Sequence, residues 1–172
     1  MCKCKRLYLL RGCPGSGKST LISKLGLEKY TISTDKIRLQ IAGTEVIDGI
    51  EMISQKKNGE VFRLVNYYIQ EAMSLGNPIV LDATNITDTG KYYKLANEYG
   101  YEVVVVDFKV SLEVLLERNK TRGIAYVPEP VIYKMYEKKK STPIHEGSRV
   151  IRPSDMESDW KDCLSELNNK KK

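Results

Sequence analysis

Apolar and polar residues alternate along the chain in blocks that predict strands followed by helices. Short apolar runs predict strands at 7–10, 30–33, 79–81 and 103–106, with a shorter fifth strand at 150–151. Apolar residues repeated every three to four positions predict helices at 20–25, 35–41, 61–72, 88–99, 112–120, 128–140 and about 154–168. This alternation predicts an α/β fold: a doubly wound, mostly parallel sheet of about four to five strands with helices on both faces.

Capping residues and glycines set the expected limits of these helices. Asp35, Ser111 and either Thr87 or Asp88 are residue types that cap a helix N-terminus. The stretch 43–58 contains three glycine breaks and no clear period. It predicts an irregular, mobile loop that faces the substrate.

Length and composition narrow the class of protein. The chain has 172 residues, of which 41% are hydrophobic and 29% are charged, so we expect one domain over 1–172. The N-terminal apolar run of about four residues is too short for a signal peptide or a membrane span. We therefore expect a cytoplasmic protein with no membrane partner.

Charge and cysteines change this picture only slightly. The net charge of +6 hints at a polyanionic partner, but a lysine tail at 170–172 supplies half of it. The lysines at 138–140 suit a solvated helix face as well as a nucleic-acid contact. The cysteines lack the spacing of a zinc site, and we expect free thiols at Cys2, Cys4, Cys13 and Cys163.

The most specific motif is the segment 12–19, GCPGSGKS, which fits the phosphate-binding P-loop G-x-x-x-x-G-K-[ST]. It lies between a predicted strand and a predicted helix, which is the context that the motif requires. Lys18 is expected to reach the β- and γ-phosphates of ATP, and the Ser19 hydroxyl is expected to bind Mg²⁺. The residues expected to hold ATP here are Gly12, Pro14, Gly15, Ser16, Gly17, Lys18, Ser19 and Thr20.

Polar residues follow the other predicted strands, at the sheet edge where ligands bind in such folds. Asp35 and Arg38 share a helix face, which suits a general base beside a phosphate-binding arginine, or a cap with a local ion pair. Asp82 ends an apolar strand and is favoured over Asp107 as the acid that supports the metal.

Four further residues complete the candidate site. Thr84 and Asn85 are expected to contact substrate, although Asn85 could equally brace the turn. Arg118 and Arg122 lie four residues apart on a predicted helix, so they would share one face. We expect them on a lid that closes over the phosphates, with Arg122 catalytic, rather than as solvated surface residues.

These motifs together resemble the polynucleotide 5′-hydroxyl kinases of the bacteriophage type over roughly residues 5–140. The resemblance rests on GCPGSGKST at 12–20, Asp35-x-x-Arg38, Asp82-x-Thr84-Asn85 and Glu117-Arg118-Asn119-x-x-Arg122-Gly123. It rests also on Val127-Pro128, Val131 and Met135-Tyr136. The chain departs from the family in carrying Asp-Ala-Thr-Asn rather than Asp-Thr-Asn after the third strand.

The resemblance implies a P-loop kinase domain that moves the γ-phosphate of ATP to the 5′-OH of DNA or RNA with Mg²⁺, as in nucleic-acid end repair. It implies Asp35 as general base, Arg38 on the 3′-phosphate of the acceptor, and Arg122 as the lid arginine. The site of action would be the host cytoplasm if the chain is phage-encoded. Two other functions stay open: a kinase of a small or tRNA-linked acceptor, and a nucleotide-dependent switch.

Overall fold

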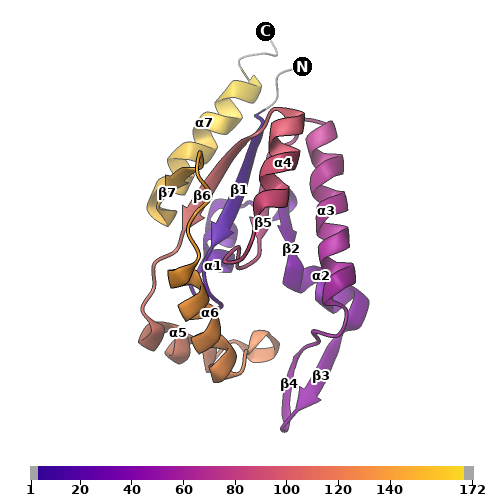
Figure 1. Ribbon diagram of the computed structural model, residues 1–172, viewed down its shortest axis with the longest axis vertical. Helices are drawn as coiled ribbons and strands as arrows, with labels where there is room; N and C mark the ends of the chain where they lie inside the picture. The colour runs from indigo at the N-terminus through magenta and orange to yellow at the C-terminus, as the bar shows by residue number, and fades with distance from the viewer. Residues whose placement is uncertain (1–3, 169–172) are drawn as a thin grey trace.

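A sheet of five parallel strands forms the centre of the computed structural model, which describes residues 4–168 (Figure 1). Its strand order is β2-β5-β1-β6-β7, and every neighbouring pair is parallel. The strands are β1 (Arg6–Arg11), β2 (Thr31–Ser33), β5 (Ile79–Asp82), β6 (Glu102–Asp107) and β7 (Arg149–Ile151). The predicted doubly wound α/β fold is confirmed, including its short fifth strand.

Seven α-helices and three short 3-10 helices connect these strands within the described residues. The α-helices are α1 (Lys18–Leu25), α2 (Thr34–Ala42), α3 (Asn58–Ser74), α4 (Gly90–Tyr99), α5 (Leu112–Asn119), α6 (Glu129–Ser141) and α7 (Met156–Asn168). The 3-10 helices are η1 (Glu28–Tyr30), η2 (Gly123–Ala125) and η3 (Pro153–Asp155). None of the helices in residues 4–168 combines the length and apolar content of a membrane span. The predicted lysine tail lies outside the described residues.

The helices cover both faces of the sheet because successive strand residues point to opposite sides. In β1, Leu7 and Leu9 pack under α3 and α4, which run side by side in Figure 1. Tyr8 and Leu10 pack on the other face with residues of α1 and α7. A third, smaller core joins α5 and α6 to Cys13 beside the carboxyl edge of the sheet.

A β-hairpin occupies most of the stretch 43–58, so the prediction of an irregular loop was wrong. Its strands are β3 (Thr44–Ile47) and β4 (Ile50–Ile53), and they pair antiparallel. Asp48 and Gly49 both have positive φ, 50° and 76°, as a two-residue hairpin turn requires. Strand alternation was hidden because Val46, Ile47 and Ile50 are exposed, so no single face reads as apolar.

Two of the predicted helix caps also differ. Ser33, not Asp35, caps α2, since its side chain accepts a hydrogen bond from the Lys36 amide at 3.4 Å. Thr89 occupies the N-cap position of α4, and Asp88 instead accepts from the Gly90 amide at 2.8 Å. The consequence matters most for Asp35, whose carboxylate stands within the first turn and is free for other contacts.

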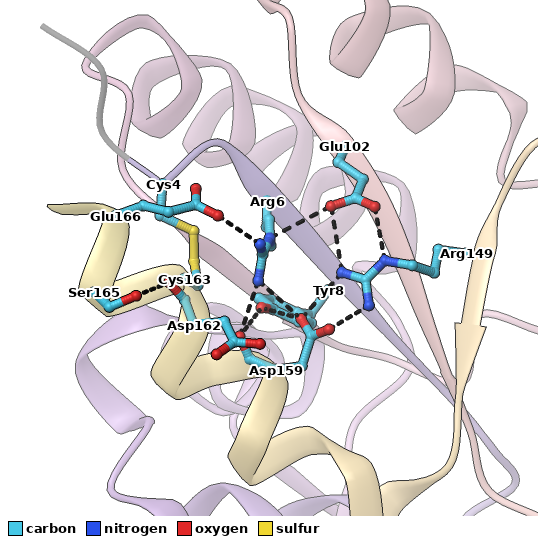
Figure 2. A network of polar contacts seen from close by, with 10 residues as sticks. All are labelled: Cys4, Arg6, Tyr8, Glu102, Arg149, Asp159, Asp162, Cys163, Ser165 and Glu166. Atoms are coloured by element: carbon cyan, nitrogen blue, oxygen red, sulfur yellow. Dashed lines mark hydrogen bonds and ion pairs between the residues drawn. A yellow bond between two sulfur atoms is a disulfide. The ribbon is translucent and has the colours of Figure 1, made fainter.

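Cys4 and Cys163 form a disulfide between the start of β1 and α7, so the expectation of free thiols was wrong for this pair (Figure 2). Their Cα atoms lie 5.2 Å apart, within the usual range for a disulfide. Cys13 is free and buried, as expected. Cys2 lies outside the described residues.

A polar network surrounds the disulfide and fastens α7 to the sheet (Figure 2). Asp159 on α7 accepts hydrogen bonds from Arg149 and, at 2.7 Å, from the Tyr8 hydroxyl. Arg6 adds an ion pair to Asp159 at 3.3 Å and one to Glu166 at 2.8 Å. These contacts hold β1, β7 and α7 together toward the amino end of β1, whereas the P-loop follows its carboxyl end (Figure 1).

Removal of the disulfide by Cys163→Ser is expected to lower the free energy of unfolding by about 2–4 kcal/mol, because the bond joins residues 159 positions apart and restricts the unfolded chain. Denaturant titrations with and without a reducing agent measure the loss. Reduction should shift the midpoint of the wild type and leave Cys163→Ser unchanged. Equal midpoints for oxidised and reduced wild type would show that the disulfide does not stabilise the fold.

Candidate active site

The P-loop runs from Gly12 to Ser19 and joins β1 to α1 at the carboxyl edge of the sheet. Gly15 and Gly17 have φ of +84° and +100°, a region that favours glycine and turns the loop back on itself. A Cβ atom on Gly12 would stand 2.9 Å from the Phe108 side chain, which is closer than real Cβ contacts, so this close approach requires glycine. No side chain caps the first turn of α1, so its backbone N–H groups are available to an anion.

Lys18 lies folded over the P-loop. Its Nζ donates hydrogen bonds to the Gly12 carbonyl at 2.8 Å, the Cys13 carbonyl at 3.0 Å and Ser16 Oγ at 3.4 Å. Burial lowers the pKa of Lys18 to about 8, and the nearby Asp82 carboxylate opposes this shift only partly. The ammonium is therefore placed where a phosphate oxygen could replace the loop carbonyls as its partner.

Asp82 and Arg122 share an electrostatic cluster with Lys18 and Asp35. Burial raises the pKa of Asp82, while Lys18 lowers it and Asp35 raises it. Burial likewise lowers the pKa of Arg122, which both carboxylates partly offset. The structure thus brings together four of the residues singled out from the sequence, from β5, α1, α2 and the segment after α5.

Arg122 has a buried Nη1 atom without a hydrogen-bond partner in the described part of the chain. The prediction that it shares a helix face with Arg118 was wrong, because α5 ends at Asn119. The Asn119 side chain donates to the Val127 carbonyl at 2.7 Å and accepts from the Val127 amide at 3.0 Å, which fixes the turn that carries Arg122. Arg118, on the helix, donates to the Gly15 carbonyl at 3.2 Å.

Asp107, the competitor of Asp82 for the metal-supporting position, is engaged elsewhere. Its Oδ1 atom lies 3.1 Å from Arg11 Nη1 and 2.9 Å from Lys139 Nζ, and all three side chains are largely buried. Such an ion pair ties β1, β6 and α6 together. The arrangement favours Asp82, which lies beside Lys18 and has no ion pair within 4.0 Å among residues 4–168.

Asp35 and Arg38, the candidate base and anion-binding residue, form an ion pair on α2. Arg38 Nη1 donates to Asp35 Oδ1 at 2.7 Å, and its Nε and Nη2 donate to Asn58 Oδ1 at 2.9 and 2.8 Å. The Asp35 side chain is 47% exposed, whereas Arg38 is only 12% exposed. Arg38 is therefore fixed by two neighbours, and Asp35 keeps an open side toward solvent.

A family model described as an AAA domain matches residues 7–140. The chain belongs to this AAA domain family. Its curated relatives include the 2′,3′-cyclic-nucleotide 3′-phosphodiesterases of Mus musculus and Rattus norvegicus, 34% and 31% identical over 129 and 124 residues. Each match covers 69% of this chain but 28% of the relative, so the chain spans less than a third of their length.

Several solved structures have the same fold as this AAA domain, and it is the fold of P-loop kinases. A candidate kinase from Chloroflexus aurantiacus has a TM-score of 0.68 at 13% identity and covers 93% of this chain and 98% of its own. The Pnkp1/Rnl/Hen1 RNA repair complex contains a chain with a TM-score of 0.65 at 19% identity, matched over 81% of this chain and 45% of that one. A sugar kinase from Janibacter matches with a TM-score of 0.60 at 14% identity, covering 94% and 95%.

Thr84 and Asn85 are hydrogen-bonded to the backbone at and just before the P-loop of the AAA domain. The Thr84 carbonyl accepts from the Gly12 amide at 3.0 Å. Asn85 has a positive φ of 51°, and its Nδ2 donates to the Leu10 carbonyl at 2.8 Å. Of the two roles left open for Asn85, the geometry matches the brace, because its amide nitrogen is directed at backbone carbonyls.

Two residues, Ser19 and Asp82, are the candidate metal ligands of the AAA domain. Ser19 is exposed at the start of α1, and Asp82 ends β5. Among residues 4–168 no cluster of three or more histidine, cysteine, aspartate or glutamate side chains could hold a metal. Ser19 and Asp82 nevertheless suit Mg²⁺, which takes oxygen ligands, keeps several waters and binds one or two protein groups together with substrate phosphates.

Proposed function

We propose that this AAA domain is an ATP-dependent polynucleotide 5′-hydroxyl kinase, which transfers the γ-phosphate of ATP to the 5′-OH of DNA or RNA. One observation carries the proposal. The Asp35–Arg38 pair stands beside the same charge cluster that holds Lys18, Asp82 and Arg122. A base and an anion-binding arginine next to a P-loop are the parts that transfer to an acceptor hydroxyl requires.

ATP would bind with its phosphates on the P-loop amides and the N-terminus of α1, with Lys18 on the β- and γ-phosphates. Ser19 and Asp82 would hold Mg²⁺, directly or through water. When bound, the ion neutralises charge on the phosphate oxygens. Arg118 on α5 and Arg122 just before η2 would contact the phosphates.

In the chemical step, Asp35 takes the proton from the acceptor 5′-OH as that oxygen forms its bond to the γ-phosphorus. The bond from the γ-phosphorus to the β–γ bridging oxygen breaks, and ADP leaves with that electron pair. Arg38 holds the acceptor through its 3′-phosphate, and Arg122 neutralises charge on the transferring group. The products are ADP and a 5′-phosphorylated end, with one proton released.

Three features support a nucleic-acid acceptor. The net charge of the chain is +6. One structural neighbour belongs to an RNA repair complex. The curated relatives are named as phosphodiesterases of cyclic nucleotides. A role in nucleic-acid end repair agrees with all three. The resemblance of the motifs to the bacteriophage-type kinases points the same way.

A kinase of a small or tRNA-linked acceptor is the second candidate, because Arg38 offers a single anion site beside Asp35 and a sugar kinase shares the fold. The presence of Asp35 argues against the third candidate, a nucleotide-dependent switch, since a switch positions water rather than a substrate hydroxyl. Steady ATP hydrolysis without an acceptor would favour the switch.

Transfer of labelled γ-phosphate from ATP to 5′-OH oligonucleotides of DNA and RNA, with Mg²⁺, tests the proposal. We expect a labelled 5′ end. No transfer to any oligonucleotide, from protein shown to bind ATP, would contradict the nucleic-acid acceptor. Transfer to sugars or nucleosides under the same conditions would then support the small-acceptor kinase.

The lowered pKa of Lys18 predicts how ATP affinity depends on pH. The charged form binds phosphate, and without ligand its fraction falls as pH rises through about 8. The Kd for ATP should therefore be nearly constant below pH 7.5 and should rise above pH 8, toward about tenfold per pH unit. Calorimetric titrations from pH 6.5 to 9.5 measure this, with Lys18→Met as the variant that lacks the step. A Kd that stays constant in the wild type up to pH 9.5 would contradict the assignment.

A further inference from the structure

The first turns of α3 and α4 lie beside the Asp35–Arg38 pair, at the carboxyl edge of the sheet. Helix α3 leads into β5 and α4 follows it, and the two helices contact each other along their length (Figure 1). Asn58, the first residue of α3, holds the Arg38 guanidinium. The positive ends of both helix dipoles therefore point toward the region where the acceptor would enter.

The Phe62 ring connects Arg38 to a second cation. Arg38 Cζ lies 5.9 Å from the centre of the ring, and Lys91 Nζ lies 5.1 Å from the same centre. Phe62 is half-buried on α3, and Lys91 is exposed on the first turn of α4. Both cations thus lie against one side chain, which keeps Arg38 Cζ and Lys91 Nζ no more than about 11 Å apart.

Lys91 lies in the first turn of α4, where its positive charge opposes the helix dipole. A cation in the first turn of a helix is disfavoured by the helix dipole, and α4 has no acidic residue in that turn. Lys91 makes no ion pair within residues 4–168, and its contacts are with the Phe62 and Tyr92 rings, the latter at 5.0 Å. No carboxylate of the described residues thus neutralises the Lys91 charge, which leaves the ammonium available to an anionic ligand.

We propose that Lys91 binds the second phosphate of the acceptor strand, one nucleotide beyond the phosphate held by Arg38, and that Phe62 sets the spacing of the two sites. This inference rests on the proposed kinase function, and it makes the ligand a polynucleotide rather than a mononucleotide. An acceptor with two phosphates engages both cations, whereas one with a single phosphate engages Arg38 alone. Lys91 is in these terms a specificity-determining residue.

Two acceptors that differ by one nucleotide, and so carry one and two phosphates, test the proposal: thymidine 3′-monophosphate, and a dithymidine dinucleotide that carries a free 5′-OH and a 3′-phosphate. In the wild type, kcat/KM for the dinucleotide should exceed that for the mononucleotide about tenfold. In Lys91→Ala this ratio should fall to about one. Lys91→Arg, which restores the charge, should recover most of it.

Lys94→Ala is the matched control, because Lys94 is also exposed, on the next turn of α4, and it is Lys91 that lies over the Phe62 ring. Its ratio should equal that of the wild type. A second measurement is the binding of a 3′-labelled single-stranded oligonucleotide by anisotropy at several salt concentrations. Loss of one phosphate contact in Lys91→Ala should reduce the slope of log K against log salt by about 0.7.

The outcomes separate the two proposals. A wild-type ratio near one, or an equal fall of kcat/KM for both acceptors in Lys91→Ala, would overturn the second phosphate site and leave the kinase function in place. Absence of transfer by the wild type would overturn the kinase function. In that case the oligonucleotide-binding measurement alone would test the Lys91 phosphate site. Equal slopes of log K against log salt for the wild type and Lys91→Ala would overturn the site.

Discussion

Arg122→Ala is expected to lower kcat for phosphoryl transfer by about 10³-fold, which is the scale of an arginine that stabilises the transferring phosphoryl group. The structural reason is the buried Nη1 atom, which has no partner in residues 4–168, on a guanidinium that the Asp35 and Asp82 charges influence. A guanidinium held in this state gains its missing partner when charge develops on the phosphoryl oxygens. Single-turnover kinetics with saturating ATP and acceptor measure the loss.

Two further arginines show whether the effect belongs to Arg122. Arg118→Ala should cost less than Arg122→Ala, because the Arg118 guanidinium already donates to the Gly15 carbonyl at the P-loop surface. Arg63→Ala, on the exposed side of α3, should leave kcat unchanged. Equal losses for Arg118→Ala and Arg122→Ala, or a rise in KM without a fall in kcat for Arg122→Ala, would refute the special position of Arg122.

Asp35→Asn is expected to lower kcat by about 10²–10⁴-fold, the range for removal of a general base. Asparagine keeps the size of the side chain but cannot take the proton from the acceptor hydroxyl. Because Arg38 remains bound to Asn58, the acceptor should still bind, and its KM should change by less than the rate. Initial rates with labelled ATP over a range of acceptor concentrations separate the two constants.

Asp82→Asn provides the comparison for Asp35→Asn. Its loss should be partly recovered by raised Mg²⁺ if Asp82 supports the metal, whereas Mg²⁺ should not rescue Asp35→Asn. Retention of more than about a tenth of the wild-type rate by Asp35→Asn would assign the proton to another group. An equal response of both variants to Mg²⁺ would contradict their separate roles.

The sequence predicts what depends on neighbouring residues. The P-loop is recognisable because its glycines, Lys18 and Ser19 all lie within eight consecutive positions. The strand that ends at Asp82 and the capped start of α5 at Ser111 are local in the same sense. Placement of the polar residues at one edge followed from the rule for parallel sheets.

What the sequence could not give depends on residues far apart. The Cys4–Cys163 disulfide joins positions whose closeness only the folded sheet creates. The assignment of Asp107 to a structural ion pair needed Lys139, 32 positions later. Asn58 was missed as the partner of Arg38 because it lies 20 positions away. The end of α5 before Arg122 depends on Asn119 contacts to Val127 that no helix period reveals.

The β3–β4 hairpin packs against both α2, which carries Asp35 and Arg38, and η2, which follows Arg122. In the proposed kinase, a movement of η2 over bound ATP would therefore shift β4, and with it the helix that carries Asp35 and Arg38. The two substrates would then bind with positive cooperativity, each favouring the arrangement that the other requires. Water, which contacts neither Arg38 nor the hairpin, would not favour that arrangement, so ATP would be spared from wasteful hydrolysis until an acceptor arrives.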